Sequence, residues 1–438
     1  MFSIKHESRF TKITLGIILA LFLGLCFASF TYHSDTLLGS LEKMDNDDVK
    51  YLRSAWTFLD TGKLTYQSPE NKTVFIMPGL TILLSGFCAV FGRLPIIQFK
   101  IFQAILGACS IYIIFLAGRK MYSSGAGLAA AFLAAIYSAA VYVTNLILTE
   151  AVFAFLFVLL FYVSFEAVDR KSMKLYLWGG VVLGLATLFR PTVLLYPVAI
   201  FVIWFIKKYK AAEMLKYGSA VVGVVILILS PWMVRNYVVF DRFIPLTISS
   251  GNPFAQGTYI DYDQEAEVEN DRSIDYVGII TKRAAEKGMD INDAANDEIV
   301  LDFVEKQRGI IRVEQVMTEE PLRYIKWYTI GKTAENWSRP FLWINLFGTE
   351  FKLTNNQHTA YLILGFIGIL YTFLRKRQNP FFYMALLTIL YFNTVYLPFY
   401  CFSRYMYPVM FCWMLFAGFL LYDIFTHIFG RIRKGAGA

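Results

Sequence analysis

Long apolar runs separated by short polar segments are the dominant pattern along the chain. A helix that crosses a bilayer core of roughly 30 Å needs about 20 apolar residues, and run after run of this chain approaches or reaches that length. The pattern therefore predicts an all-α polytopic membrane protein with about ten transmembrane helices. The predicted spans are residues 12–31, 97–117, 124–143, 151–167, 175–189, 192–206, 216–234, 358–374, 380–397 and 404–426.

Basic clusters between the apolar runs predict the orientation of the chain. Lysine and arginine favour cytoplasmic loops, and with these spans the clusters fall on one side, which makes both termini cytoplasmic. Residues 74–92 are a borderline run, interrupted by Pro78 and Gly79. If they crossed the membrane, every later basic cluster would be inverted, so we expect an interfacial or re-entrant segment packed against protein. Residues 12–31 are too long for the apolar part of a signal peptide and are expected to remain as the first helix.

Composition and charge exclude several other classes of protein. Hydrophobic residues make up 57% of the chain and charged residues 17%, against roughly 25% charged in a soluble domain. The net charge of +8 is spread over short clusters and forms no basic stripe of the kind that binds nucleic acid. The five cysteines show no CxxC spacing, so neither a disulfide framework nor a zinc site is indicated.

Three regions follow from the spans. Residues 1–234 form an N-terminal transmembrane module with an acidic first outer loop at 32–73, and residues 358–438 form the C-terminal transmembrane helices. Residues 235–357 lie between them on the outer side, and 261–320 carry 17 acidic against 7 basic residues. Helical spacing from Ile291 and a second amphipathic stretch from Pro321 predict juxtamembrane helices and a small helical lid over the outer mouth of the bundle.

Ionisable residues gather on the outer side, where a bilayer makes them costly unless they are paired or used. Asp47 and Asp48 lie in the acidic first loop, and Glu150 begins an apolar helix. Acids in a first helical turn also stabilise the helix dipole, so each has a structural alternative. Arg190, Arg235 and Arg404 fall on the same side. Each fits a snorkelling helix end, but three together favour an anionic ligand such as phosphate.

A succession of motifs resembles a known family. The chain contains, in order, "DDVKYLRSAWTFLDTGKLTY", "MPGLTILLSGFCAVFG", "LTE", "GLATLFRP", "SPWMVRNYVVFDRFIPLTISSG" and "SRYMYP". Together they resemble the bacterial GT-C glycosyltransferases, and more narrowly the protein mannosyltransferase and lipid A aminoarabinose transferase group of glycosyltransferase family 39 type. The resemblance implies a bacterial plasma membrane protein that uses polyprenyl-phosphate-linked sugars. Many relatives have a double proline where this chain has "MPG".

The resemblance also implies roles for the charged residues. Asp47 corresponds to the catalytic base, with Asp48 as an alternative one residue away, and Glu150 corresponds to the acidic residue of the second outer loop. Arg190 and Arg404 correspond to groups near the lipid phosphate, and Arg235 and Lys72 are weaker candidates for it. These residues predict no cofactor; the alternative is a divalent cation between Asp47 and Glu150, because hard cations prefer carboxylate ligands.

The chemistry that these residues suit is an inverting displacement. The phosphate of a polyprenyl-phosphate sugar leaves with its charge held by arginines, so a carboxylate needs only to deprotonate the acceptor hydroxyl. The partners would be the lipid-linked donor and a lipid, protein or glycan acceptor in the cell envelope. The alternative from another class is a transporter or lipid-linked-sugar flippase, which would place charges or broken helices near mid-membrane in paired halves.

Overall fold

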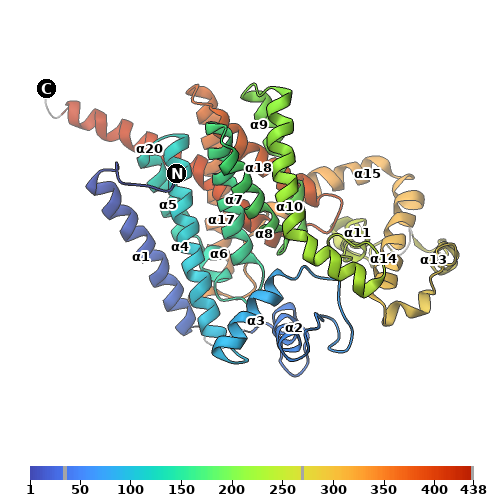
Figure 1. Ribbon diagram of the computed structural model, residues 1–438. Coiled ribbons are helices and arrows are strands. Elements are labelled where there is room, and N and C mark those ends of the chain that lie inside the picture. Colours follow the sequence, from blue (N-terminus) through green and yellow to red (C-terminus); the bar gives the residue numbers. More distant parts are fainter. Residues whose placement is uncertain (33–36, 268–270, 436–438) are drawn as a thin grey trace.

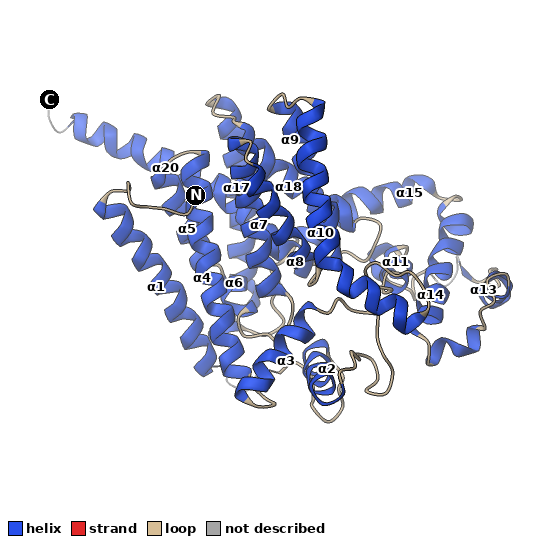
Figure 2. Cartoon of the chain, viewed as in Figure 1, coloured by secondary structure: helices blue, strands red, loops and turns tan. Residues whose placement is uncertain are grey.

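The computed structural model describes residues 1–32, 37–267 and 271–435, with side chains up to 428. All regular elements in these ranges are helices, as predicted (Figure 2). Part of the predicted first outer loop, residues 33–36, lies outside the described residues. The N-terminal helices are α1 (Arg9–Tyr32), α2 (Asp47–Thr61), α3 (Gly79–Phe91), α4 (Ile96–Met121), α5 (Ser124–Ala135), α6 (Ser138–Val143), α7 (Glu150–Arg170), α8 (Met173–Thr187), η1 (Pro191–Leu195), α9 (Pro197–Ile206) and α10 (Ala211–Phe240).

The remaining helices divide into the segment 235–357, called here the outer segment after its predicted position, and a C-terminal group. The C-terminal helices are α17 (Phe351–Leu374), α18 (Pro380–Tyr396), α19 (Ser403–Met406), η7 (Tyr407–Val409) and α20 (Met410–Gly435). The helices of the outer segment are α11 (Gly251–Gly257), η2 (Ile260–Tyr262), α13 (Tyr276–Ala285), η3 (Ile291–Ala295), α14 (Glu298–Arg312), η4 (Val313–Met317), α15 (Pro321–Lys326), η5 (Trp327–Gly331), α16 (Lys332–Trp337) and η6 (Leu346–Gly348).

Apolar helices occur at all the predicted spans, and the protein is a multi-pass membrane protein. Within the described residues, 6 helices are long and apolar enough to cross a bilayer by themselves, and shorter apolar helices accompany them. They stand side by side in one bundle, with the outer segment beside it (Figure 1). The stretch predicted to be helical from Ile291 is divided between η3 and α14 in that segment, and the stretch from Pro321 forms α15, η5 and α16.

The predicted span 124–143 is broken between α5 and α6, and a side chain of α17 explains the break. Gln357 donates from Nε2 to the carbonyl of Ile136 at 2.7 Å, and its Oε1 accepts from the backbone N–H of Ser138 at 3.0 Å. Backbone groups freed inside an apolar bundle need such partners. The break is therefore satisfied by a residue far away in the sequence, which local pattern does not reveal.

The basic clusters between the helices lie at one end of the bundle. Arg119 pairs with Glu7 of the N-terminal segment at 3.1 Å. Asp169 at the end of α7 accepts from Lys120 at 3.2 Å and from Lys207 at 3.3 Å. These ion pairs join the N-terminal segment and the α4–α5, α7–α8 and α9–α10 connections into one polar layer.

The interrupted run 74–92 forms the short helix α3, which begins directly against the end of α8. The N–H of Gly79 donates to the carbonyl oxygen of Leu188 at 2.8 Å. A Cβ at this position would lie 2.5 Å from the same oxygen, so the approach requires glycine. Leu188 precedes Arg190 by two residues. The contact therefore places the start of α3 beside the site described next.

A buried arginine lies at the centre of a polar cluster inside the outer segment. Arg312 is fully buried, and its Nε donates to Thr258 Oγ1 at 3.0 Å. Its Nη2 lies 3.1 Å from Glu267 Oε2, Asp271 accepts from its Nη1, and its guanidinium lies 3.8 Å from the ring centroid of Tyr259. The acidic excess of this region is thus partly neutralised inside it.

Candidate functional site

Glu150 lies at the centre of the site, at the first position of α7. Its side chain is 1% exposed, and one oxygen, Oε1, receives two arginines. Arg190 Nη2 donates to it at 2.5 Å, and Arg404 Nε donates to it as well. Arg190 occupies the extended turn between α8 and η1, and Arg404 lies in α19. Three distant segments therefore meet at one carboxylate, whose second oxygen, Oε2, has no hydrogen-bond partner among the described residues.

Asp47, the first residue of α2, is joined to this centre through Arg404. Arg404 Nη1 lies 3.2 Å from Asp47 Oδ2, and the hydroxyl of Tyr66 donates to Asp47 Oδ1 at 2.6 Å. Burial raises the pKa of Asp47, but the charge of Arg404 and the Tyr66 hydrogen bond outweigh it, so the pKa lies below its usual value. Asp47 is thus an ionised carboxylate at neutral pH, and its side chain remains 43% exposed.

Asp48 points elsewhere, although it is the next residue in the chain. Its carboxylate accepts the backbone N–H groups of Leu38 at 2.5 Å, Gly39 at 3.2 Å and Val49 at 2.8 Å. Its side chain is buried among the backbone that precedes α2. The structure thus separates the two neighbouring acids: Asp47 contacts Arg404, and Asp48 holds the first loop against α2.

Arg235 and Lys72, predicted near the phosphate, are not part of this cluster. Arg235 Nη1 donates to the carbonyl of Thr73 at 2.6 Å, and its guanidinium lies over the rings of Trp232 and Phe240. It therefore ties the first outer loop to α10. Lys72 is exposed to solvent. Neither side chain lines the cavity at the site.

A cavity of about 350 Å³ opens beside Asp47, Arg190 and Arg404. Its remaining wall combines aromatic side chains with hydroxyl groups, which suits a ligand with both apolar faces and hydrogen-bonding groups. The other lining residues are Tyr51, Tyr66, Phe75, Ile76, Met77, Phe189, Pro191, Thr192, Thr247, Ser249, Ser250, Pro253, Tyr396, Phe399, Tyr400 and Tyr405. Four of these residues, Thr247, Ser249, Ser250 and Pro253, belong to the segment 235–357, which therefore supplies one wall of the cavity. The stretches from Ile291 and from Pro321, on which the predicted lid was based, do not line it.

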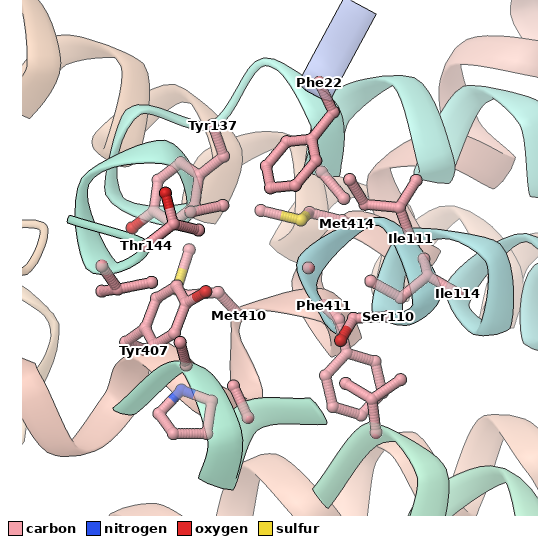
Figure 3. Close-up of a pocket in the computed structure, with 18 of the residues that line it drawn as sticks. Phe22, Ser110, Ile111, Ile114, Tyr137, Thr144, Tyr407, Met410, Phe411 and Met414 are labelled. Carbon is pink, nitrogen blue, oxygen red and sulfur yellow. The ribbon is translucent and has the colours of Figure 1, made fainter. Parts of the chain in front are cut away.

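A second cavity, inside the bundle, has a different character. It measures about 50 Å³, and apolar side chains such as Phe22, Met410 and Met414 surround it (Figure 3). Its lining residues include no charged side chain. The larger cavity at the arginines is therefore the candidate site.

Several residues of the site were missed by sequence reasoning. Tyr66 contacts Asp47, and Thr149 accepts from Arg190 Nε at 3.2 Å. The guanidinium of Arg190 also lies near the rings of Phe153 and Tyr405, 5.5 and 5.6 Å from their centroids. Aromatic residues form 17% of the chain, so an aromatic side chain near a charge carries little signal by itself. The threonine directly before Glu150 was the one local clue.

The carboxylates as arranged do not fit a divalent cation between them. Glu150 already receives two guanidinium groups, and Arg404 lies between it and Asp47. A hard divalent cation requires several oxygen ligands. Among the described residues, no group of three or more His, Cys, Asp or Glu side chains converges to hold a metal ion.

Comparison with known proteins supports the resemblance seen in the sequence. The sequence model of the dolichyl-phosphate-mannose-protein mannosyltransferases matches residues 77–234. This range contains Glu150 and Arg190. No curated protein sequence matches the chain.

Solved structures of an archaeal enzyme show the same fold. The oligosaccharyltransferase of Archaeoglobus fulgidus in its apo form is similar at a TM-score of 0.60 and 17% identity, over 99% of this chain and 53% of that one. Its complex with an inhibitory peptide and a dolichol-phosphate is similar at a TM-score of 0.56 and 17% identity, over 98% and 52%. ArnT from Cupriavidus metallidurans bound to undecaprenyl phosphate matches at 0.44 and 14%, over 96% and 78%.

The chain thus spans about half the length of the archaeal enzyme that it matches. It is similar in sequence to the dolichyl-phosphate-mannose-protein mannosyltransferases over residues 77–234, and it has the GT-C membrane fold of the archaeal oligosaccharyltransferase over nearly its whole length.

Proposed function

We propose that the protein is a membrane glycosyltransferase that moves a sugar from a polyprenyl-phosphate-linked donor to a lipid, protein or glycan acceptor. The observation that carries this proposal is Arg404, whose guanidinium is shared between the buried Glu150 and the half-exposed Asp47 at the edge of the cavity. The family match over 77–234 and the dolichol-phosphate bound by the archaeal relative support a lipid phosphate as the carrier.

The arginines suit the leaving phosphate. Guanidinium groups match phosphate oxygens in shape and charge, and Arg190 and Arg404 both line the cavity. Glu150 balances one of their two charges and fixes their direction, because its Oε1 accepts from both. A phosphate held in this way departs as a stabilised anion and needs no proton from a general acid.

Asp47 suits the base. The acceptor hydroxyl oxygen attacks the anomeric carbon of the sugar, the bond from that carbon to the phosphate oxygen breaks, and the hydroxyl proton passes to Asp47. The products are the glycosylated acceptor and free polyprenyl phosphate, and the configuration at the anomeric carbon is inverted. Asp47 is ionised at neutral pH and accessible from the cavity, as a base in this step must be. Asp48 is assigned a structural role.

The orientation in the membrane follows from charge. The basic residues that form ion pairs at one end of the bundle would lie in the cytoplasm under the positive-inside rule. Both termini would then be cytoplasmic, and Asp47 and Arg404 would act on the outer face of a plasma membrane. A donor with a lipid tail and an acceptor from the envelope meet at that surface.

The direct test is release of free polyprenyl phosphate by the purified protein. A panel of polyprenyl-phosphate sugars is incubated with the protein and an acceptor membrane extract, with Asp47→Asn beside the wild type. We expect release by the wild type from one donor class and loss of release in the variant. Absence of release from every donor would overturn the proposal.

A further inference from the structure

The connection between α18 and α19 carries part of the candidate site. Phe399 and Tyr400 line the cavity, and Arg404 follows four residues later. Residues 397–402 lie between α18 and α19 and outside both helices. The last turn of α18 binds the N–H groups of Leu397 and Phe399, and the other backbone groups need partners from elsewhere. The position of this connection, called here the 397–401 loop, therefore depends on what else binds it.

The outer segment binds the backbone of this loop at four points. Lys332 Nζ donates to the carbonyl oxygens of Leu397 at 2.7 Å and Phe399 at 3.0 Å. The N–H of Tyr400 donates to the carbonyl of Pro253 at 2.7 Å, and the N–H of Cys401 donates to the hydroxyl of Tyr262 at 2.7 Å. These donors and acceptors come from three separate helices of the outer segment.

Two further features show that the backbones approach closely here and that the outer segment is locally strained. A Cβ at Gly257 would lie 2.7 Å from the carbonyl carbon of Phe399, so the two backbones touch directly. Asp261 and Tyr262 have φ of +54° and +60°, in the left-handed region that non-glycine residues rarely occupy. Strained residues persist where the surrounding structure holds them, commonly at functional sites.

Lys332 itself is an unusual residue to bury. Its side chain is fully buried, and its Nζ lies 3.7 Å from the ring centroid of Tyr328. Burial lowers the pKa of Lys332 to about 7. A well-packed apolar side chain is often as stable as a buried charge or more so, so overall stability alone does not account for a lysine at this position. What the ammonium supplies is N–H groups directed at two backbone oxygens of the loop.

We propose that Lys332 is a positioning residue that fixes the 397–401 loop, and through it Phe399, Tyr400 and Arg404, in the geometry that donor binding needs. The inference rests on the proposed function for its kinetic consequence only. Its structural consequence, a loop that opens when the contacts are removed, is independent of any reaction.

Cys401 provides a built-in probe of the loop. It is a free, buried cysteine, and burial raises the pKa of its thiol to about 11, so it reacts slowly with a maleimide while the loop is closed. The full chain is used with the exposed Cys109 replaced by serine, and modified peptides are identified by mass spectrometry. The buried Cys26, Cys88 and Cys412 serve as internal controls.

Lys332→Met removes both donated hydrogen bonds and keeps the length and apolar character of the side chain. We expect Cys401 to be labelled roughly tenfold faster in this variant, the effect of one to two lost hydrogen bonds on a local opening equilibrium. Lys326→Met, on the exposed side of the same helical stretch, is the matched control and leaves the rate unchanged. Tyr262→Phe removes only the hydroxyl contact to Cys401 and is the second test if Lys332→Met does not fold.

Kinetics then separate positioning from general stability. We expect Lys332→Met to raise KM for the donor more than it lowers kcat, and Lys332→Arg to restore much of the loss because it can still donate to both carbonyls. Wild-type rates of both labelling and transfer in Lys332→Met and Tyr262→Phe would overturn the inference. If the wild type consumes no donor at all, the proposed function fails, and the labelling experiment still decides whether Lys332 holds the loop.

Discussion

Both Asp47 and Glu150 contact Arg404, but their replacement should have different effects. We expect replacement of Asp47 to lower mainly the activity and replacement of Glu150 to lower mainly the stability of the protein. In Asp47→Asn the side chain keeps its shape, and its amide oxygen still accepts from Tyr66. The charge that takes up a proton is lost, so we expect transfer to fall by about 100- to 10,000-fold. The Asp47 side chain is 43% exposed, and a pair of that exposure contributes no more than about 1 kcal/mol to the free energy of unfolding.

Glu150→Gln disturbs the interior instead. The glutamate is 1% exposed and is the acid that pairs with Arg190. Its loss removes the acidic partner of Arg190 and leaves Arg404 with Asp47 alone, and breaking a buried pair from one side costs about 3–5 kcal/mol. Polyprenyl phosphate should recover part of this loss, because its phosphate supplies a new anion to the native state and binding stabilises that state.

Thermal unfolding in detergent and release of polyprenyl phosphate measure the two effects separately. We expect a clear fall in Tm for Glu150→Gln, a larger rise in Tm on adding polyprenyl phosphate than in the wild type, and an almost unchanged Tm for Asp47→Asn. Glu213→Gln is the control, because Glu213 pairs with Lys171 at the far end of the bundle with both side chains partly exposed. Equal losses of Tm in the two site variants, or turnover retained in Asp47→Asn, would refute the reasoning.

Three further predictions follow from single contacts. Tyr66→Phe removes a hydrogen bond that lowers the pKa of Asp47. The pKa should rise, and because the base is protonated as pH falls through it, the acid limb of the kcat/KM profile should move to higher pH. An unchanged limb would contradict this. Asp48→Asn should keep measurable transfer while loosening the first loop, seen as faster hydrogen exchange at Leu38 and Gly39. Gly79→Ala should lower stability by about 1–3 kcal/mol, the usual cost of overpacking, because its Cβ would meet a backbone oxygen at 2.5 Å; chemical or thermal denaturation checks this.

Much of the fold was predictable because apolar length and charge bias act locally. The convergence of Asp47, Glu150, Arg190 and Arg404 followed from placing four separated residues at the same end of successive helices, and the structure brings all four together. The resemblance to a family of known topology added their roles, which the contacts alone do not assign.

Side-chain direction was not predictable in the same way. Asp47 and Asp48 open the same helix, where consecutive residues point about 100° apart, so a small change of phase exchanges their surroundings. Arg235 falls at the predicted end of the bundle, yet it turns toward the carbonyl of Thr73. Lys332 belongs to an amphipathic stretch whose pattern suggests a surface helix, and its burial depends on a loop some 65 residues further along the chain.

The charges of the site imply an order of events. Asp47, Glu150, Arg190 and Arg404 sum to zero, so the site without donor is a closed set of ion pairs. An arriving phosphate must compete for Arg404, and the weaker, more exposed partner is Asp47, while Glu150 stays buried and held by both arginines. In the proposed reaction Arg404 would turn to the phosphate. Asp47 would then lose the positive neighbour that lowers its pKa and would become a stronger base. Donor binding and activation of the base would therefore be the same step. The acceptor hydroxyl would lose its proton mainly when a donor sugar is already in place for its oxygen to attack.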